Sequence, residues 1–166
     1  FDGAELDDGQ RLGEVGSGLD TALAVLGRFR VSVAAAANGF ARRALEESIA
    51  HLKSRTQFGK PLAANQGLGF DLAEMDMRLR AAELLVDEAA AAVDRGERAV
   101  LEVARAKLFA TENASYVCDR AVQHFGGLGV KRGVLVERLW RDVRALGIYE
   151  GASEIEKLLM ARELTR

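Results

Sequence analysis

The fold of this chain is decided by the segment GLDTALAVLGRFRVSVAAAANGFARRALEESIAHL, residues 18–52. Apolar side chains recur through it at steps of three and four, the spacing of one face of an α-helix. That face comprises Leu19, Ala22, Leu23, Leu26, Val33, Ala34, Ala37, Phe40, Ala41, Ala44, Leu45, Ile49 and Leu52. We therefore predict one long amphipathic helix from Gly18, which ends near Gly59 and Pro61 because these residues interrupt the pattern.

The same period continues along the rest of the chain. It predicts further helices over about 65–94, 98–124 and 135–142, and a last helix that begins at Ser153. Short connections separate them, and no alternating strand pattern appears. The expected fold class is all-α, an antiparallel four-helix bundle.

Composition excludes several classes of function. The chain has 166 residues and a net charge of −2, which gives no case for binding nucleic acid or an anionic membrane. No run approaches the ~18 apolar residues of a membrane span. The single cysteine, Cys118, cannot form an internal disulfide and is expected to be a buried thiol. His51 and His124 have no other candidate ligands clustered near them in the sequence, so no metal site is predicted. A cytoplasmic location is expected.

The stretch IYEGASEIEK, residues 148–157, holds three glutamates. Ser153 and Glu156 match the S-x-x-E capping box of a helix N-terminus, and Glu154 falls in a first turn, where the helix dipole favours an acid. These two acids thus have a structural interpretation. Glu150 precedes the cap, and two readings stay open for it: a solvated loop acid, or a general base.

Two further motifs stand earlier in the chain, RTQFGKPLAANQ at residues 55–66 and QHFGGLG at residues 123–129. Together with RDVRALGIYEGASEI, residues 141–155, they occur in the order and at the separations typical of one family. The sequence resembles the C-terminal domain of the acyl-CoA dehydrogenases from about Leu12 onward. Three motifs in register make this resemblance specific.

The resemblance implies an FAD-dependent enzyme that makes an α,β-double bond in an acyl-CoA thioester. In the family, the carboxylate at the position of Glu150 removes the α-proton while the β-hydrogen leaves as hydride to the flavin. A carboxylate in a water-excluded pocket is a stronger base, because burial raises its pKa. The resemblance assigns Arg30, Tyr149 and Gly151 to the substrate, with Arg30 on the CoA portion.

The resemblance also implies cofactor contacts. Arg55 would reach the FAD pyrophosphate of a neighbouring subunit, and Phe58 would lie beside the adenine. The full set of cofactor-binding residues expected is Arg55, Gln57, Phe58, Gln66, Gln123, His124, Phe125, Gly126, Gly127, Ala152 and Glu154. Ala152 departs from the family, which often has threonine there, and Glu154 replaces a frequent glutamine. The partners implied are an acyl-CoA, an electron acceptor such as an electron-transfer flavoprotein, and further copies of the chain in a homodimer or homotetramer.

The family's two preceding domains have no counterpart in these residues. Residues 1–17, rich in glycine and acids, are expected to be the remnant of a preceding β-domain, and residues 18–166 to form the helical domain. Alone, the chain is expected to hold FAD weakly and to be inactive. The alternatives are a non-catalytic helical assembly module and a flavin-dependent acyl-CoA oxidase.

Overall fold

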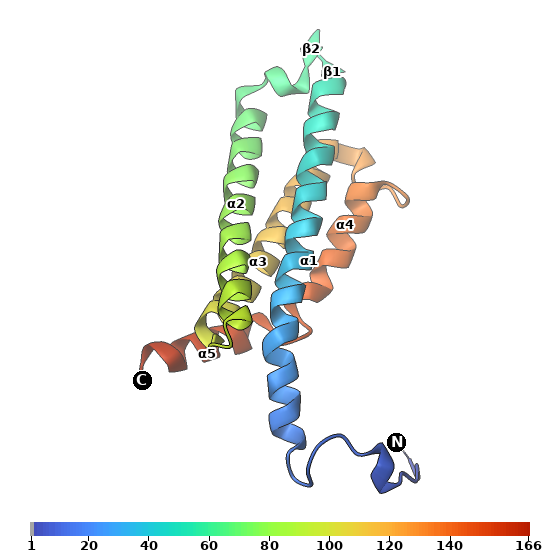
Figure 1. The fold of residues 1–166 in the computed structure, drawn as a ribbon. Coiled ribbons are helices and arrows are strands. Elements are labelled where there is room, and N and C mark those ends of the chain that lie inside the picture. Colours follow the sequence, from blue (N-terminus) through green and yellow to red (C-terminus); the bar gives the residue numbers. More distant parts are fainter. Residues whose placement is uncertain (1) are drawn as a thin grey trace.

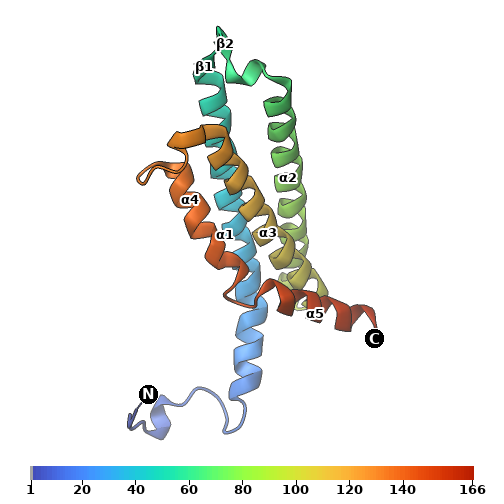
Figure 2. The same ribbon diagram turned by 180° about the vertical axis from the view of Figure 1, so that it is seen from behind.

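Four helices run antiparallel to one another, and a fifth crosses one end of the bundle (Figures 1 and 2). The computed structural model describes residues 2–166. The long helices are α1 (Gly18–Ser54), α2 (Gln66–Asp94) and α3 (Val100–Phe125), and the shorter ones are α4 (Leu135–Val143) and α5 (Ser153–Leu164). Short 3-10 turns stand at Asp8–Gln10, Leu62–Ala64, Gly126–Leu128 and Arg144–Gly147. The all-α, four-helix prediction is confirmed.

The largest interface lies between α1 and α3, and both helices bury small side chains. Four alanines of α1 and four of α3 are fully buried: Ala34, Ala37, Ala41, Ala44, Ala106, Ala110, Ala114 and Ala121. Alanine lets two helix backbones approach closely and costs no side-chain entropy in a helix. Larger side chains such as Met75, Leu79 and Val136 fill the core toward α2 and α4. Cys118 is buried within the same core, as predicted.

A small hairpin joins α1 to α2, where the sequence pattern predicted no strand. Strands β1 (Thr56–Gln57) and β2 (Lys60–Pro61) pair antiparallel. Phe58 and Gly59 between them both have positive φ, +50° and +78°. Two such residues form the turn that matches the twist of a two-residue hairpin. The strands are too short to give an alternating pattern, and for this reason the sequence did not reveal them.

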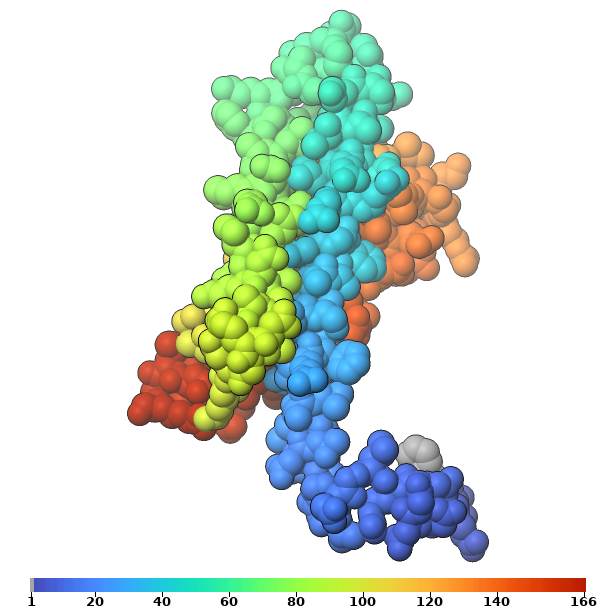
Figure 3. Space-filling view, viewed as in Figure 1, coloured from blue at the N-terminus to red at the C-terminus, as the bar shows by residue number. Residues whose placement is uncertain are grey.

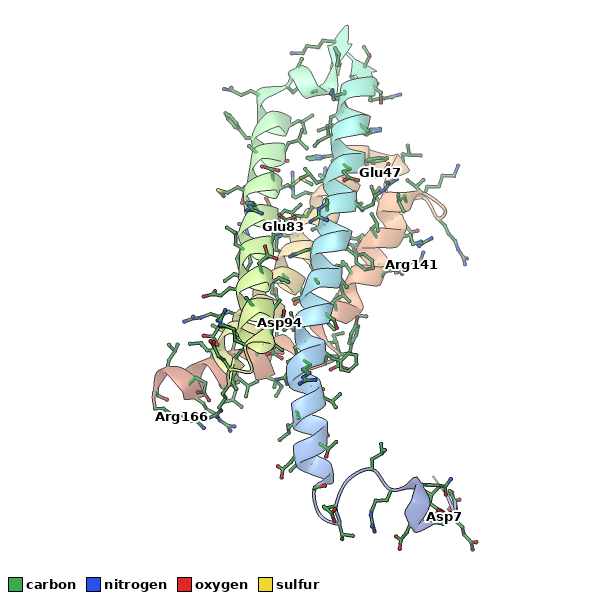
Figure 4. All side chains as sticks on the ribbon, in the orientation of Figure 1. Asp7, Glu47, Glu83, Asp94, Arg141 and Arg166 are labelled. Carbon is green, nitrogen blue, oxygen red and sulfur yellow. The ribbon has the colours of Figure 1, made fainter. Side chains whose placement is uncertain are left out.

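Charged side chains cross-link the helices at the bundle surface. Glu83 of α2 lies beside α1, where Arg42 donates a 2.5 Å hydrogen bond to its carboxylate (Figure 4). That hydrogen bond lowers the pKa of Glu83 below its ordinary value, although partial burial opposes the change. On α4, Arg141 pairs with Glu137 one turn earlier.

The N-terminal part of α1 extends beyond the body of the bundle, and the segment before it projects further (Figure 3). Several of its apolar side chains are exposed, among them Leu19, Leu23 and Phe29. Within residues 2–166, no helix combines the length and apolar character needed to cross a bilayer.

Candidate functional site

The connection between α4 and α5 contains a strained turn at Glu150 and Gly151. Glu150 adopts φ +56°, a left-handed conformation that side chains rarely take, and Gly151 follows at φ +101°. Two cations, one partly buried and one fully buried, bind the carbonyls of this turn. Arg30 Nε of α1 donates to the Glu150 carbonyl at 3.0 Å, and Lys107 Nζ of α3 donates to the Gly151 carbonyl at 2.5 Å.

A buried acid completes the cluster. The side chain of Glu156 on α5 is 0% exposed, and its Oε1 atom lies 3.1 Å from Arg30 Nε. The Arg30 N–H is directed at the Glu150 carbonyl, and neither oxygen of Glu156 has a hydrogen-bond partner among residues 2–166. Glu156 therefore interacts with its surroundings chiefly through charge.

The pKa shifts of the residues in this cluster follow mainly from their burial. Burial raises the pKa of Glu156 above its ordinary value, although the charges of Arg30 and Lys107 act against this. Burial likewise lowers the pKa of Lys107, and the charge of Glu156 offsets part of that change. Each charge is thus partly compensated by the others inside the fold.

The predicted capping box is wrong. The helix N-cap is Ala152, with no side-chain capping bond, and Ser153 is already the first helical residue. The Ser153 hydroxyl instead donates to Glu112 Oε1 of α3 at 2.6 Å. Glu156 reaches inward to Arg30. Tertiary partners took both side chains away from the local bonds that their spacing favours.

One oxygen of the Glu150 side chain is buried without a partner among the described residues. Its Oε2 atom is buried and makes no hydrogen bond to any residue in the described part of the chain. Its neighbour Tyr149 is 45% exposed, Ala152 is partly exposed, and Glu154 is exposed at the start of α5. A buried carboxylate oxygen without a donor is costly unless a ligand or water serves it.

Most of the predicted cofactor residues gather at the opposite end of the bundle. Arg55, Gln57 and Phe58 lie in the hairpin connection after α1, and Gln66 opens α2 beside it. Phe58 is fully exposed. The C-terminal end of α3 brings Gln123, Phe125, Gly126 and Gly127 to the same end, where Phe125 stacks on His51 of α1 with ring centroids 4.1 Å apart.

One residue of that set points inward. The His124 side chain is 0% exposed, and its Nε2 lies 3.2 Å from Asp71 Oδ2 of α2. Arg120 also donates to this carboxylate. Burial lowers the pKa of His124, although Asp71 opposes the change. His124 therefore links α3 to α2 beneath the exposed loop. The residues next to it in the chain face outward, but its own side chain does not.

Sequence reasoning missed Lys107, Glu112 and the inward role of Glu156. One signal was available for Lys107, since it stands three residues after Ala104 and four before Thr111, on the face of α3 predicted to be buried. A lysine at an inward position needs a partner or an acceptor. No comparable signal distinguished Glu156 from a capping acid.

The two groups of residues are far apart. Arg30 and Arg55 belong to one straight helix and its C-cap, 25 residues apart, so about 37 Å separate them along the axis at 1.5 Å per residue. The Glu150 turn and the hairpin end thus form two separate groups of candidate residues on one chain.

Comparison with known proteins identifies the family. Residues 16–165 match the model of "Acyl-CoA dehydrogenase, C-terminal domain", so the chain belongs to the acyl-CoA dehydrogenase family. An acyl-CoA dehydrogenase of Bacillus subtilis (strain 168) is 43% identical over 99% of the chain and 43% of its own length. The caffeyl-CoA reductase-Etf complex subunit CarC of Acetobacterium woodii is 40% identical over 94% of the chain and 41% of its own length.

The fold agrees with this family. Butyryl-CoA dehydrogenase from Megasphaera elsdenii superposes with a TM-score of 0.91 at 39% identity, over 93% of this chain and 40% of that one. The chain thus spans about two-fifths of the length of these relatives.

Proposed function

We propose that this chain is the base-bearing and subunit-contacting domain of an FAD-dependent acyl-CoA dehydrogenase, acting as part of a longer chain. The reaction is the α,β-dehydrogenation of an acyl-CoA thioester. The observation that carries this proposal is the Glu150 turn, where a strained backbone presents a buried carboxylate oxygen that has no hydrogen-bond donor among residues 2–166. Strain of this kind concentrates at functional sites.

Glu150 removes the α-proton of the thioester through Oε2. The Glu150 N–H donates to no other backbone group among the described residues, and this leaves it able to bind the thioester carbonyl oxygen. A donor at that position stabilises the negative charge that develops as the proton leaves. Gly151 lets the backbone turn directly after the base, with Glu156 and Arg30 filling the space where a side chain would stand, and Tyr149 flanks the turn.

The exposed end of the bundle suits FAD. Arg55 would bind a pyrophosphate, with exposed Phe58 beside the adenine and Gln57, Gln66 and Gln123 as polar contacts. Gly126 and Gly127 have open space where a side chain would stand, so a ligand can approach their backbone. FAD, when bound, supplies the acceptor for the β-hydride. Ala152 and Glu154 would lie on the flavin side of the Glu150 turn.

The separation of the two sites supports an assembly of subunits. With about 37 Å between them, one chain would present its base to one cofactor and its hairpin end to the cofactor of a partner subunit. A homodimer or homotetramer provides this arrangement. The proposed electron acceptor is an electron-transfer flavoprotein, and the proposed location is the cytoplasm.

Glu150→Gln in the complete FAD-loaded protein tests the proposal. We expect kcat for acyl-CoA oxidation to fall at least about 10²–10⁴-fold, the usual contribution of general base catalysis. The flavin absorbance spectrum should stay unchanged, because the amide keeps the size of the carboxylate. The matched control is Glu88→Gln, which alters an exposed acid of α2.

Stopped-flow absorbance of flavin reduction under anaerobic conditions measures this step. Reduction by Glu150→Gln at the rate of the Glu88→Gln control would reject the base assignment and favour a helical assembly module. Rapid reoxidation by oxygen in the wild type would identify an acyl-CoA oxidase in place of a dehydrogenase.

A further inference from the structure

The turn that carries Glu150 is held from two sides by side chains of distant helices. Lys107 of α3 binds the Gly151 carbonyl, and Arg30 of α1 binds the Glu150 carbonyl. Glu156 of α5 lies against Arg30 and Gly151 so closely that a Cβ on Gly151 would overlap its Oε1 atom. These contacts fix the two peptide groups on either side of the Gly151 Cα atom, directly after the base.

We propose that Lys107 and Glu156 are positioning residues for the base, a role that rests on the proposed function of Glu150. Lys107 fixes the backbone of the turn through the Gly151 carbonyl. Glu156 holds the Arg30 guanidinium against the Glu150 carbonyl and balances its charge. Neither side chain is exposed, so neither is available to a substrate.

The geometry favours this role over simple core packing. A left-handed Glu150 returns to a relaxed conformation unless its surroundings hold it. The bound carbonyls are those of Glu150 and Gly151, the two residues with positive φ, and the donors reach no other carbonyl of the turn. A buried lysine and a buried glutamate would otherwise be costly substitutes for apolar side chains.

The cluster also sets the charge around the base. Two cations, Arg30 and Lys107, face two acids, Glu156 and Glu150, and the exposed acid Glu112 lies beyond Ser153. Removing the Lys107 cation makes ionisation of a nearby carboxylate less favourable, while removing the Glu156 anion makes it more favourable. Removing the cation and removing the anion should therefore move the acid limb of the pH dependence of kcat in opposite directions.

Lys107→Met and Glu156→Gln in the complete FAD-loaded protein test the proposal. We expect each to lower kcat, Lys107→Met by about 100-fold as for a misplaced catalytic group, with little change in KM. The acid limb of kcat should move to higher pH in Lys107→Met and to lower pH in Glu156→Gln. In the double variant the limb should return toward the wild-type position while kcat stays low.

The controls distinguish a failure of this inference from a failure of the proposed function on which it rests. Lys157→Met alters an exposed lysine of α5 next to Glu156 and should leave both the pH profile and kcat unchanged. Thermal melting and flavin content of each variant establish that it is folded. If Lys107→Met fails to fold, Glu156→Gln alone decides, because its amide keeps the shape of the site.

Two results would overturn the inference. One is a pH profile and kcat in folded Glu156→Gln or Lys107→Met equal to those of Lys157→Met, while Glu150→Gln is inactive. The other is a shift of the acid limb in the same direction in both variants. Full activity of Glu150→Gln would instead reject the proposed function itself.

Discussion

At the scale of single residues, Gly151 is a position that cannot readily accept a side chain. Its φ of +101° strains any other residue, and an added Cβ would overlap Glu156 and crowd Arg30. We expect Gly151→Ala to lower the free energy of unfolding by about 2 kcal/mol or more. Urea denaturation followed by circular dichroism measures it.

Substitution of Gly39 should change the free energy of unfolding in the opposite direction. It stands inside α1 with nothing within 4 Å of an added Cβ. Gly39→Ala should therefore raise the free energy of unfolding by about 1 kcal/mol, because alanine is the better helix former. Equal effects of the two substitutions would show that the Gly151 turn is not rigid.

Single residues also mark the limit of sequence reasoning. The spacing of Ser153 and Glu156 predicted a cap, and each instead binds a partner more than 40 residues away, Glu112 or Arg30. A local motif specifies which bond is possible, while the packing of distant helices decides whether it forms. Glu150 was found because nothing local explained it, and its positive φ could not be read from its residue type.

At the scale of the elements, the alanines between α1 and α3 fix how closely these helices approach. Ala37 is fully buried at this interface, whereas Ala36 on the same helix is exposed. Ala37→Leu should lower the free energy of unfolding by about 1–3 kcal/mol through overpacking, and Ala36→Leu should change it by less than about 0.5 kcal/mol. Chemical denaturation compares the two. A tolerated leucine at Ala37 would mean that the interface can open.

Element boundaries were predictable because helical periodicity is strong over long stretches. The predicted ranges 65–94, 98–124 and 135–142 differ from α2, α3 and α4 by two residues or fewer at each end. The β1–β2 hairpin was not predictable, because two-residue strands show no period. Its turn depends on backbone angles at Phe58, an aromatic residue that rarely adopts them.

At the scale of the whole molecule, the buried His124 and its partner Asp71 should make stability depend on pH. The pKa of His124 is lowered in the folded state, mainly by burial, from an ordinary value of 6.5. The unfolded chain therefore binds more protons below that value, and the free energy of unfolding should fall as the pH drops through the folded-state pKa. Burial lowers the pKa of His51 in the same direction.

Glu156 acts with the opposite sign, because its pKa is raised on folding. Comparison with His124→Gln therefore isolates the histidine. We expect the wild type to lose more stability than this variant between pH 7 and pH 5, as measured by thermal melting in matched buffers. Parallel losses in both proteins would place the acid sensitivity elsewhere.

The whole-molecule arrangement of the site was the part that sequence could not supply. The motifs stand in order along the chain, but only the antiparallel course of α1, α2 and α3 sends residues 55–66 and 123–127 to one end and Glu150 to the other (Figure 1). The resemblance predicted both groups of residues, and the length of α1 sets the distance between them.

The three side chains around the Glu150 turn come from residues 30, 107 and 156, on the first, third and fifth helices. Contacts between such distant parts of a chain require the intervening segments to have closed into loops. The strained turn therefore acquires its shape only after α1, α3 and α5 have docked. A partly folded copy, even one with most of its helices intact, would lack the contacts that hold Glu150 in its left-handed conformation. The base is therefore positioned only when the whole domain has folded.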